Sequence, residues 1–477
     1  MHCSTVKSRL YGVTDGFIFK LFESVQMKSL IEMALDKANA WHKKACVLNA
    51  TLMMSFVLLM SLRRDLSYSN LCKELVGMLR DRAPDKKIPL KPFTNEAVIK
   101  ARQRLGAEPL KLLFESGAEK IFTTSKFFGF TTYGVDGVQF TMPDTKANEE
   151  CYKRPVTSRG GRAAFPKLRL TPLVCTATHQ IRAVEIGQHD ADERQACKQL
   201  LKYLGKDDLL YMDSGFAAAW LFREITDRNI QFISRISLAW KPEIIHRNGP
   251  GDYLVELSPV ENIPGTKDSN GRYKTRRVKT VVRLIEYRTK KNSLVRLVTS
   301  LLDPEKYPAR ELALSYHLRW ETELAYDEIK THLFTVKHGL LHTNFRSKNP
   351  KDVDQEVYGM LAAYNFIRAT MNEVALTYDI EPLEISFVES LHVITKALDK
   401  MEAATPDQVP ILYDRMLEDL AACRLKRSRR KRCNPRKVKV KMSNYKRKRE
   451  GDYGEIRDFE EELCLLECTS LPKEGNN

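Results

Sequence analysis

The sequence lacks the motifs that identify zinc proteins and ATPases. Its ten cysteines include no C-x-x-C pair, and the C-x3-C spacing of Cys464 and Cys468 is followed by no second ligand pair. We therefore expect reduced, intracellular thiols and no structural zinc. A Walker-type phosphate loop is missing too, because Gly205-Lys206 lacks the upstream Gly and the following Ser or Thr. We expect no nucleotide cofactor.

Long apolar runs are scarce as well. Ala45–Leu62 is the one stretch that imitates a membrane span, but it is barely long enough to cross a bilayer and is diluted by Asn49, Thr51, Ser55 and Ser61. We interpret it as a buried core helix. No secretory signal is visible at the N-terminus, so we predict a cytoplasmic protein without a membrane-spanning segment.

Positive charge is abundant, with a formal net charge of +17. Fifteen basic residues and no acidic residue lie between Arg424 and Arg449, whereas Glu450–Asn477 carries nine acidic residues against two basic ones. A basic excess concentrated in one run indicates a polyanionic partner, most simply nucleic acid. A further hypothesis is that the acidic end folds back on the basic run when DNA is absent.

Hydrophobic periodicity divides the chain into four segments. Residues 1–125 are predicted to be helical, and residues 126–345 to form an α/β region that a β-rich insertion interrupts at 238–295. Helices return in residues 346–423, and residues 424–477 form the basic and then acidic tail. No internal repeat is visible.

One short helix of the N-terminal segment is basic. The peptide TNEAVIKARQRLG, residues 94–106, begins with good N-cap residues, ends in Gly and carries Lys100, Arg102 and Arg104. Such a helix could enter a groove of DNA, or its cations could form an ordinary solvated face. The sequence favours neither interpretation.

The α/β region shows three strands, a helix, a strand, a helix and a strand. This order is typical of a mixed sheet covered by helices. The predicted strands are Gly129–Thr141, Lys167–Thr178, Ile181–Gln188, Asp208–Asp213 and Ile230–Ile236, and the predicted helices are Ala191–Leu204 and Ala217–Arg228.

Two aspartates lie at strand ends in this region. Asp136 lies in YGVDGVQF and Asp213 in LLYMDSGF. A carboxylate at the end of an apolar strand must be solvated, paired or bound to a cation, and sites in open α/β sheets form outside the strand ends. Asp213 alone could cap the next helix, but two such residues in predicted neighbouring strands strengthen the case for a hard-cation site.

The predicted helix SYHLRWETELAYDEIK carries a polar stripe. At about 100° per residue, four polar residues fall within an arc of about 60°, opposite an apolar face. We expect the apolar face to bury against the sheet and the stripe to point away from the core, although the pattern alone also fits a salt-bridged surface. The stripe contains Tyr316, Arg319, Glu323 and Lys330, and the apolar face contains Leu314, Leu318, Ala325 and Ile329.

The stripe has the spacing Y-x2-R-x3-E-x6-K, which resembles the Y-R-E-K signature of bacterial insertion-sequence transposases, specifically insertion-sequence family 4. VDGVQFTMPDTKAN around Asp136 is similar to the first-Asp block of that family, and YMDSGF around Asp213 is similar to the second. ARQRLG near the N-terminus and RCNPRKVKVKMSNY near the C-terminus also look like family segments. The similarity therefore extends over most of the chain.

This resemblance implies an RNase H-like α/β catalytic core, a mixed sheet with helices, in residues 126–345, with the β-rich insertion placed before the Glu-bearing helix. Helical regions would flank the core, and the N-terminal one, residues 1–125, would bind DNA. The resemblance also implies roles for the site residues. Asp136, Asp213 and Glu323 would be the catalytic and metal-binding triad, and Tyr316, Arg319 and Lys330 would contact transposon-end DNA near the cleaved phosphate.

The chemistry of this residue set agrees with those roles. Three carboxylates without His or Cys form an oxygen site for Mg²⁺ or Mn²⁺, and two such ions would serve an in-line displacement at phosphorus. We therefore predict a nucleoid-associated DDE transposase that cuts double-stranded DNA at terminal inverted repeats and joins the ends to target DNA, as a homodimer in the DNA complex. The alternatives are an RNase H-fold nuclease or resolvase that does not join ends, and a catalytically inactive derivative that only binds DNA.

Overall fold

In a computed structural model the chain forms two compact units. The first unit comprises residues 1–125, 136–203 and 321–425, and the second comprises residues 126–135, 204–320 and 426–477. Most of the basic run and of the acidic end lies outside the residues that the structure describes. The described residues are 13–14, 16–24, 27–42, 46–119, 121, 123–156, 161–258, 260–267, 273–277, 279–289, 294–333, 345–425, 432–433, 457–458 and 463–465.

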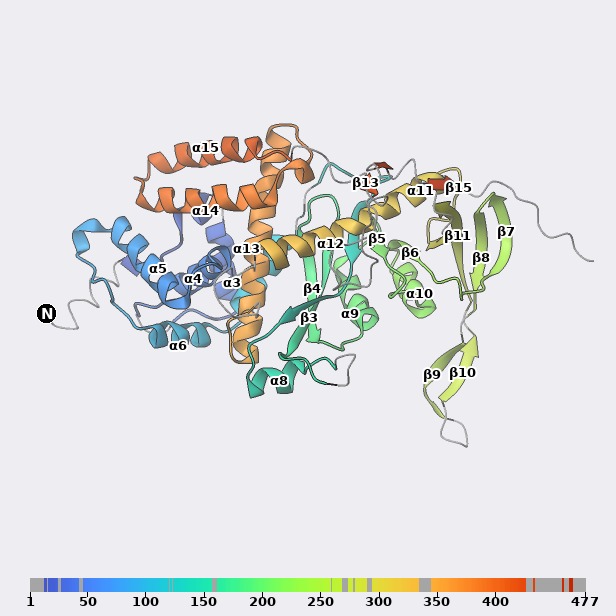
Figure 1. The fold of residues 1–477 in the computed structure, drawn as a ribbon, viewed down its shortest axis with the longest axis horizontal. Helices are drawn as coiled ribbons and strands as arrows, with labels where there is room; N and C mark the ends of the chain where they lie inside the picture. The colour runs from blue at the N-terminus through green and yellow to red at the C-terminus, as the bar shows by residue number, and fades with distance from the viewer. Residues whose placement is uncertain are drawn as a thin grey trace, which may run out of the picture. The chain divides into compact units, whose positions relative to one another are not determined.

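Helices from both ends of the chain build the core of the first unit (Figure 1). Apolar residues of segments 1–125 and 346–423 belong to one buried cluster, so these two helical segments pack together; their division into separate functional domains stays a prediction. The helices are α2 (Lys20–Ser24), α3 (Met27–Lys37), α4 (Ala50–Leu62), α5 (Tyr68–Arg82), α6 (Asn95–Leu105), α7 (Glu108–Ala118), α13 (Pro350–Thr377), α14 (Phe387–Ala403) and α15 (Gln408–Ala422).

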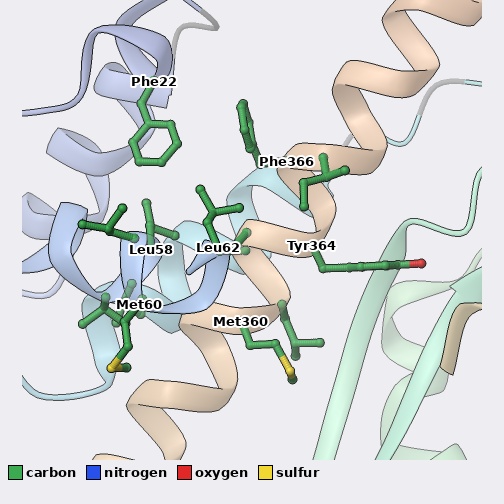
Figure 2. Close-up of a cluster of buried hydrophobic side chains, with 14 of the residues drawn as sticks. Phe22, Leu58, Met60, Leu62, Met360, Tyr364 and Phe366 are labelled. Atoms are coloured by element: carbon green, nitrogen blue, oxygen red, sulfur yellow. The ribbon is translucent and has the colours of Figure 1, made fainter. Parts of the chain in front are cut away.

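Helix α4 lies inside this core, where all 13 of its residues are buried. Figure 2 shows Leu58 and Leu62 of α4 in the same cluster as Phe366 of α13. The two helices approach closely because α13 carries a glycine at Gly359, where a Cβ would lie only 2.5 Å from Cγ1 of Val57. The predicted buried core helix is confirmed. At about 20 Å, α4 is shorter than a bilayer core, and none of the described helices is long and apolar enough to cross a membrane.

The basic helix α6 begins with a Thr94 cap, as predicted. Its three cations differ in exposure. Lys100 and Arg104 are exposed, whereas Arg102 is buried and its Nε donates to Oε1 of Gln355 on α13 at 2.9 Å. Arg102 therefore joins α6 to α13, and only the other two cations face solvent.

Three antiparallel strands, in the order β2–β3–β4, complete the first unit. They are accompanied by helices α8 and α9. The bounds are β2 (Val138–Thr141), β3 (Lys167–Cys175), β4 (Ile181–Gln188), α8 (Lys146–Tyr152) and α9 (Glu193–Leu200).

The second unit contains strands in the order β1–β5–β6–β12–β11–β8–β7. The first three are parallel, and the later neighbours are antiparallel, so the predicted mixed sheet with helices is confirmed. The bounds are β1 (Thr131–Val135), β5 (Asp208–Met212), β6 (Gln231–Arg235), β7 (Glu243–Gly249), β8 (Asp252–Leu257), β11 (Thr280–Thr289), β12 (Leu294–Thr299), α10 (Ala219–Asp227) and α11 (Ala309–Ser315).

The β-rich insertion continues this sheet, because β11, β8 and β7 extend it beyond β12. Strands β9 (Val260–Lys267) and β10 (Tyr273–Arg277) form a separate antiparallel ladder. A fully buried arginine, Arg283, anchors the insertion. Its guanidinium forms hydrogen bonds of 2.7 and 2.6 Å with Asp252 and donates to the carbonyl of Tyr307 at 2.7 Å. The insertion is thereby fixed to the segment that leads into α11.

The prediction of one strand over Gly129–Thr141 is wrong, because the chain forms two strands there. β1 pairs in parallel with β5, whereas β2 pairs antiparallel with β3. The break falls at Asp136, whose Oδ1 accepts the N–H of Gly137 at 2.8 Å. Local bonds from a side chain to the backbone compete with strand pairing, and the chain leaves its first partner at this point.

Short backbone ladders connect parts of the charged tail. β13 (Arg432–Cys433) pairs antiparallel with β14 (Arg457–Asp458), so the basic run and the acidic end meet there along the backbone. β15 (Leu463–Leu465) pairs antiparallel with β11. The pairing of β13 with β14 agrees with the hypothesis that the acidic end folds back on the basic run. The effect of this fold-back on DNA binding stays a prediction.

Candidate active site

Asp136 and Asp213 follow two strands that lie side by side. β1 and β5 pair in parallel, with Gly134 opposite Tyr211, and each aspartate is the first residue after its strand. The prediction that these strands are neighbours is confirmed. Parallel neighbours end at the same edge of a sheet, which is where sites of open α/β sheets form.

Two hydrogen bonds hold the end of β5, one at Asp213 and one at Met212. Asp213 is half-buried, and its Oδ1 accepts the N–H of Gly215 at 2.7 Å. The hydroxyl of Tyr316 donates to the carbonyl of Met212 at 3.1 Å. Burial raises the pKa of the Tyr316 phenol, Arg319 lowers it and Asp213 raises it further. The net rise keeps the hydroxyl protonated, and therefore a donor, at neutral pH.

The end of β1 is held in a similar way. Asp136 is half-buried, and its carbonyl accepts the hydroxyl of Tyr326 at 2.8 Å. Gly137 leaves room for a neighbouring carboxylate, since a Cβ there would lie 1.9 Å from Oε1 of Glu193. Glu193 forms an ion pair with Arg169. A fourth carboxylate, neutralised by its own arginine, thus lies beside the Asp136–Gly137 peptide.

Glu323 lies on helix α12 (Trp320–Asp327) and is half-buried. It precedes Tyr326 by three residues, or about one helical turn. Burial raises the pKa of Tyr326 well above its usual range, and the carboxylates of Asp136, Glu193 and Glu323 raise it further. Asp136 and Glu323 therefore both act electrostatically on the Tyr326 phenol, within the first unit.

Sequence reasoning missed Tyr326 and Glu193. The spacing of one turn between Glu323 and Tyr326 could have drawn attention to the tyrosine, because residues three apart share a helix face. No local pattern links Glu193 to Asp136, since their proximity depends on the packing of α9 against β3 and β4.

The helix that carries the Y-R-E-K residues is not a regular α-helix. Between α11 and α12 lies a 3-10 segment, η3 (Tyr316–Arg319), and after α12 a π-helical segment, η4 (Glu328–Leu333). A 3-10 turn advances about 120° per residue and a π turn less than an α turn, so a constant step of 100° misplaces the residues along the stretch.

The prediction of an outward polar stripe is therefore wrong in part. Tyr316 and Arg319 are buried, whereas Glu323 is half-buried and Lys330 is exposed. On the predicted apolar face, two residues are buried as expected and two are only half-buried. The buried pair is Ala325 and Ile329, and the half-buried pair is Leu314 and Leu318.

The two cations of the signature have different surroundings. Arg319 is buried, and its guanidinium lies over the Trp320 ring, 4.6 Å from the centroid. Lys330 is exposed, yet partial burial of its ammonium group and the charge of Lys167 lower its pKa. A cation that burial and a second cation disfavour is stabilised by a nearby anion, and a phosphate would supply one.

The predicted triad is divided between the units, with Asp136 and Glu323 in the first and Asp213 in the second. Within the described part of the chain, no group of three or more His, Cys, Asp or Glu residues could hold a metal ion. The donor chemistry nevertheless fits a hard cation, because three half-buried carboxylates offer the oxygen ligands that Mg²⁺ and Mn²⁺ prefer. The assignment of these residues as ligands stays a prediction.

Comparison with known proteins adds to this geometry. Residues 131–366 match the transposase DDE domain family, and residues 18–115 match the N-terminal domain of insertion element 4 transposases. The transposase InsG for insertion sequence element IS4 of Escherichia coli (strain K12) is 30% identical over 362 residues, which are 74% of this chain and 79% of the relative. The putative transposase InsZ of the same strain is 27% identical over 129 residues, 26% of this chain and 43% of that protein.

Among solved structures, a piggyBac transposase synaptic complex with hairpin DNA, determined by cryo-EM, covers 77% of this chain and 76% of its own. Its sequence identity is 12% and its TM-score 0.41, which is too distant a likeness to carry an argument.

The mixed sheet with its helices, the two aspartates after adjacent parallel strands and the matched DDE domain define a DNA transposase with an RNase H-like fold. Enzymes of this class use divalent metal ions. The chain belongs to insertion-sequence family 4 of the DDE transposases. The predictions of a DDE transposase, of DNA as its partner and of divalent metal use are confirmed at this level.

Proposed function

We propose that Asp136, Asp213 and Glu323 are the catalytic carboxylates of this transposase, and that they bind two Mg²⁺ or Mn²⁺ ions. The observation that carries the proposal is that Asp136 and Asp213 each follow one of two adjacent parallel strands. In support, Tyr326 fastens α12, the helix of Glu323, to the Asp136 carbonyl. Ions bound to these carboxylates would supply activation of the nucleophile and neutralisation of charge at phosphorus.

The other signature residues act on DNA in this proposal. Arg319, stacked on Trp320, grips a phosphate with two N–H groups, and Lys330 provides a point charge. Tyr316, whose hydroxyl donates to the carbonyl of Met212, contacts the same DNA and keeps the end of β5 in place beside it. The same carboxylates serve cleavage and strand transfer, because only the nucleophile changes, from water to the 3′-hydroxyl of the cut end.

We infer further that the DNA is double-stranded and carries the terminal inverted repeats of an insertion sequence, and that two copies of the chain pair two such ends. We also infer that the enzyme acts at the bacterial nucleoid, because its substrate is DNA. The exposed cations of α6, Lys100 and Arg104, are candidates for contacts to the ends outside the catalytic core.

The test uses purified protein, a DNA fragment with candidate terminal repeats and a target plasmid, with and without Mg²⁺. Wild-type protein is expected to cut the ends and to join them to the plasmid only when Mg²⁺ is present. Nicks without joined products would instead indicate a nuclease or resolvase. The mass of the protein–DNA complex, measured in solution, tests the pairing of two copies.

The variants Asp136→Ala, Asp213→Ala and Glu323→Ala assign the site. Each is expected to lose cleavage and joining while it still binds end DNA in a mobility-shift assay. Cleavage at the wild-type rate in any of the three would remove that residue from the site. Loss of folding together with DNA binding would show a structural role instead.

A further inference from the structure

A polar cluster, buried apart from the half-buried Glu328, lies in the first unit beside the segment that carries Glu323 and Lys330. Its members come from three places: the loop between β3 and β4, the stretch from α12 to η4, and α13. We name it the His179 cluster. It consists of His179, Glu321, Glu328, Tyr364 and Arg368.

His179 bridges two carboxylates of the Glu323 segment. Its Nε2 lies 2.8 Å from Oε2 of Glu321, and its Nδ1 lies 3.2 Å from Oε1 of Glu328. These glutamates are seven residues apart, so they lie on one side of the segment about two turns from each other. The imidazole is 3% exposed and the Glu321 side chain 6%, so water cannot replace these contacts readily.

Helix α13 holds Glu328 from the other side. Arg368 forms an ion pair with Glu328, its Nε lies 3.0 Å from Oε2, and the Tyr364 hydroxyl donates to the same Oε2 at 2.8 Å. The Nη2 of Arg368 also lies 3.0 Å from Nδ1 of His179. Burial alone would raise the pKa of Glu328, but Arg368 and His179 lower it to about 2. Glu328 is therefore charged, fully bonded and fixed in position.

Two further features distinguish the cluster from apolar core packing. His179 has a positive φ of 61° in the turn that joins β3 to β4, where its N–H donates to the carbonyl of Cys175 at 2.8 Å, so the turn sets the direction in which the imidazole points. Glu328 is also the first residue of the π-helical segment, and such segments are often found at functional sites. Buried ionic groups rarely improve stability over apolar packing, so the cluster needs another explanation.

We propose that His179 is a positioning residue, which sets the place of Glu323 and Lys330 by fixing Glu321 and Glu328. Each anchored glutamate precedes a signature residue by two positions. Loss of either anchor leaves that part of the helical stretch free to rotate or slide, and displacements of about 1 Å can cost about 10²-fold in rate. The proposal rests on the proposed role of Glu323.

The test compares two glutamates that the structure makes alike. Glu328 and Glu356 are both carboxylates paired with an arginine, although the Glu328 side chain is 16% exposed and that of Glu356 is fully buried. Oε1 of Glu356 lies 2.5 Å from Nη1 of Arg64, and Glu356 lies on α13 outside the His179 cluster. Glu328→Gln and Glu356→Gln therefore remove the same charge with the same change of shape, and only the first disturbs the segment of Glu323.

Three quantities are measured for full-length protein: the melting temperature, the affinity for end DNA without Mg²⁺, and the single-turnover cleavage rate at saturating protein with Mg²⁺. Both glutamine variants are expected to melt earlier and to bind end DNA like the wild type. Glu328→Gln is expected to lower the cleavage rate about tenfold or more, and Glu356→Gln to leave it unchanged. Equal rate losses in the two variants would overturn the proposal.

A second pair of variants tests His179 itself. His179→Leu is expected to lower the cleavage rate as Glu328→Gln does, whereas His179→Gln, whose amide can occupy the place of Nε2 beside Glu321, is expected to recover part of the rate. A wild-type rate in His179→Leu would overturn the positioning role. The result for Glu323→Ala separates the two proposals: if that variant still cleaves, the proposed active site fails, and if it is inactive while His179→Leu is normal, only the positioning role fails.

Discussion

Tyr316 and Tyr326 lie ten residues apart in one helical stretch, and each donates its hydroxyl to a main-chain carbonyl at the end of a strand. Tyr316 binds the carbonyl of Met212, the residue before Asp213, whereas Tyr326 binds the carbonyl of Asp136 itself. Both phenols are buried, and both serve an aspartate that follows one of two adjacent parallel strands. The two strand ends are thus secured by the same device within different units.

The difference between the two tyrosines lies in their electrostatic surroundings. Arg319 lowers the pKa of Tyr316 against the effects of burial and Asp213, whereas the nearby charges that raise the pKa of Tyr326 are all carboxylates. A family signature includes Tyr316 and omits Tyr326, although Tyr326 is bonded directly to a proposed ligand. A residue outside the signature can therefore lie as close to a proposed metal ligand as a residue within it.

Of the variants that test the two tyrosines, Tyr326→Phe is expected to have the larger effect. Removing the hydroxyl leaves the Asp136 carbonyl without this donor and releases Asp136 from α12, so the cleavage rate should fall about 10²-fold. The free energy of unfolding should fall by about 1 kcal/mol, as for one lost hydrogen bond. Tyr413→Phe is the control, since that hydroxyl donates to Glu373 at 2.9 Å elsewhere in the same unit. A similar rate loss in the control would show that general destabilisation is the cause.

A smaller loss, about tenfold in the cleavage rate, is expected for Tyr316→Phe. Its acceptor is one residue away from Asp213, and the Asp213 carboxylate keeps its own bond to the N–H of Gly215. Single-turnover cleavage and mobility-shift assays on the same end DNA measure this variant beside Tyr326→Phe. If Tyr316→Phe proves the more damaging, the ranking by distance from the carboxylate is wrong.

The glycines after the two aspartates allow a finer comparison. A Cβ at Gly137 would lie 1.9 Å from Oε1 of Glu193, whereas a Cβ at Gly215 would lie 3.0 Å from Oδ1 of Asp213. Gly137→Ala must therefore displace Glu193 from Arg169 and should lower the cleavage rate several-fold. Gly215→Ala needs only a shift of a few tenths of an ångström and should lower it less.

The double variant Gly137→Ala, Glu193→Ala tests the cause of that loss. It removes the group that the new methyl would strike, so the cleavage rate should recover toward the wild-type value. Failure to recover would mean that the backbone at Gly137, and not the crowding of Glu193, sets the rate.

The parts of the fold that follow from local burial were predictable. The apolar run Ala45–Leu62 correctly indicated a buried helix, and the order of strands and helices correctly indicated a mixed sheet, because periodicity records which faces are covered. The break at Asp136 was missed because the strand-like pattern of Gly129–Thr141 continues across it. That break depends on the partners of β1 and β2, which lie far away in the sequence.

The residue types of the proposed site indicated the class of enzyme, whereas the directions of its side chains did not follow from the sequence. The Y-R-E-K spacing indicated a DDE transposase, but the directions predicted for its four side chains were wrong in part because η3 and η4 interrupt the α-helix. Those segments lie at long-range contacts: Tyr316 donates to Met212, and Glu328 pairs with Arg368. A prediction that assumes a regular α-helix, with about 100° between successive residues, cannot include such contacts. The burial of Arg319 therefore could not be inferred from the spacing of the residues.

Because the two tyrosines are buried, their titration makes the stability of the protein depend on pH in alkaline solution. At neutral pH both phenols are protonated in the folded and the unfolded chain, so stability does not depend on their titration. Both folded phenols have a raised pKa, whereas in the unfolded chain the pKa is about 10. Above pH 10 the unfolded chain releases these protons and the folded chain keeps them, so the folded state binds more protons and its stability falls as pH rises. Their contribution is complete below pH 10 and is lost progressively as pH approaches the folded pKa.

Each buried phenol therefore contributes a slope of about 1.4 kcal/mol per pH unit above pH 10. Denaturant unfolding of the wild type, Tyr316→Phe and Tyr326→Phe at several pH values measures it, because lysine titration is common to all three proteins and cancels. Each Phe variant should show a shallower loss than the wild type. Carboxylates raise the pKa of Tyr326, whereas Arg319 lowers that of Tyr316. The difference in slope between variant and wild type should therefore persist to higher pH for Tyr326→Phe. Parallel curves of stability against pH for all three proteins would mean that neither phenol is buried and hydrogen-bonded in the folded protein.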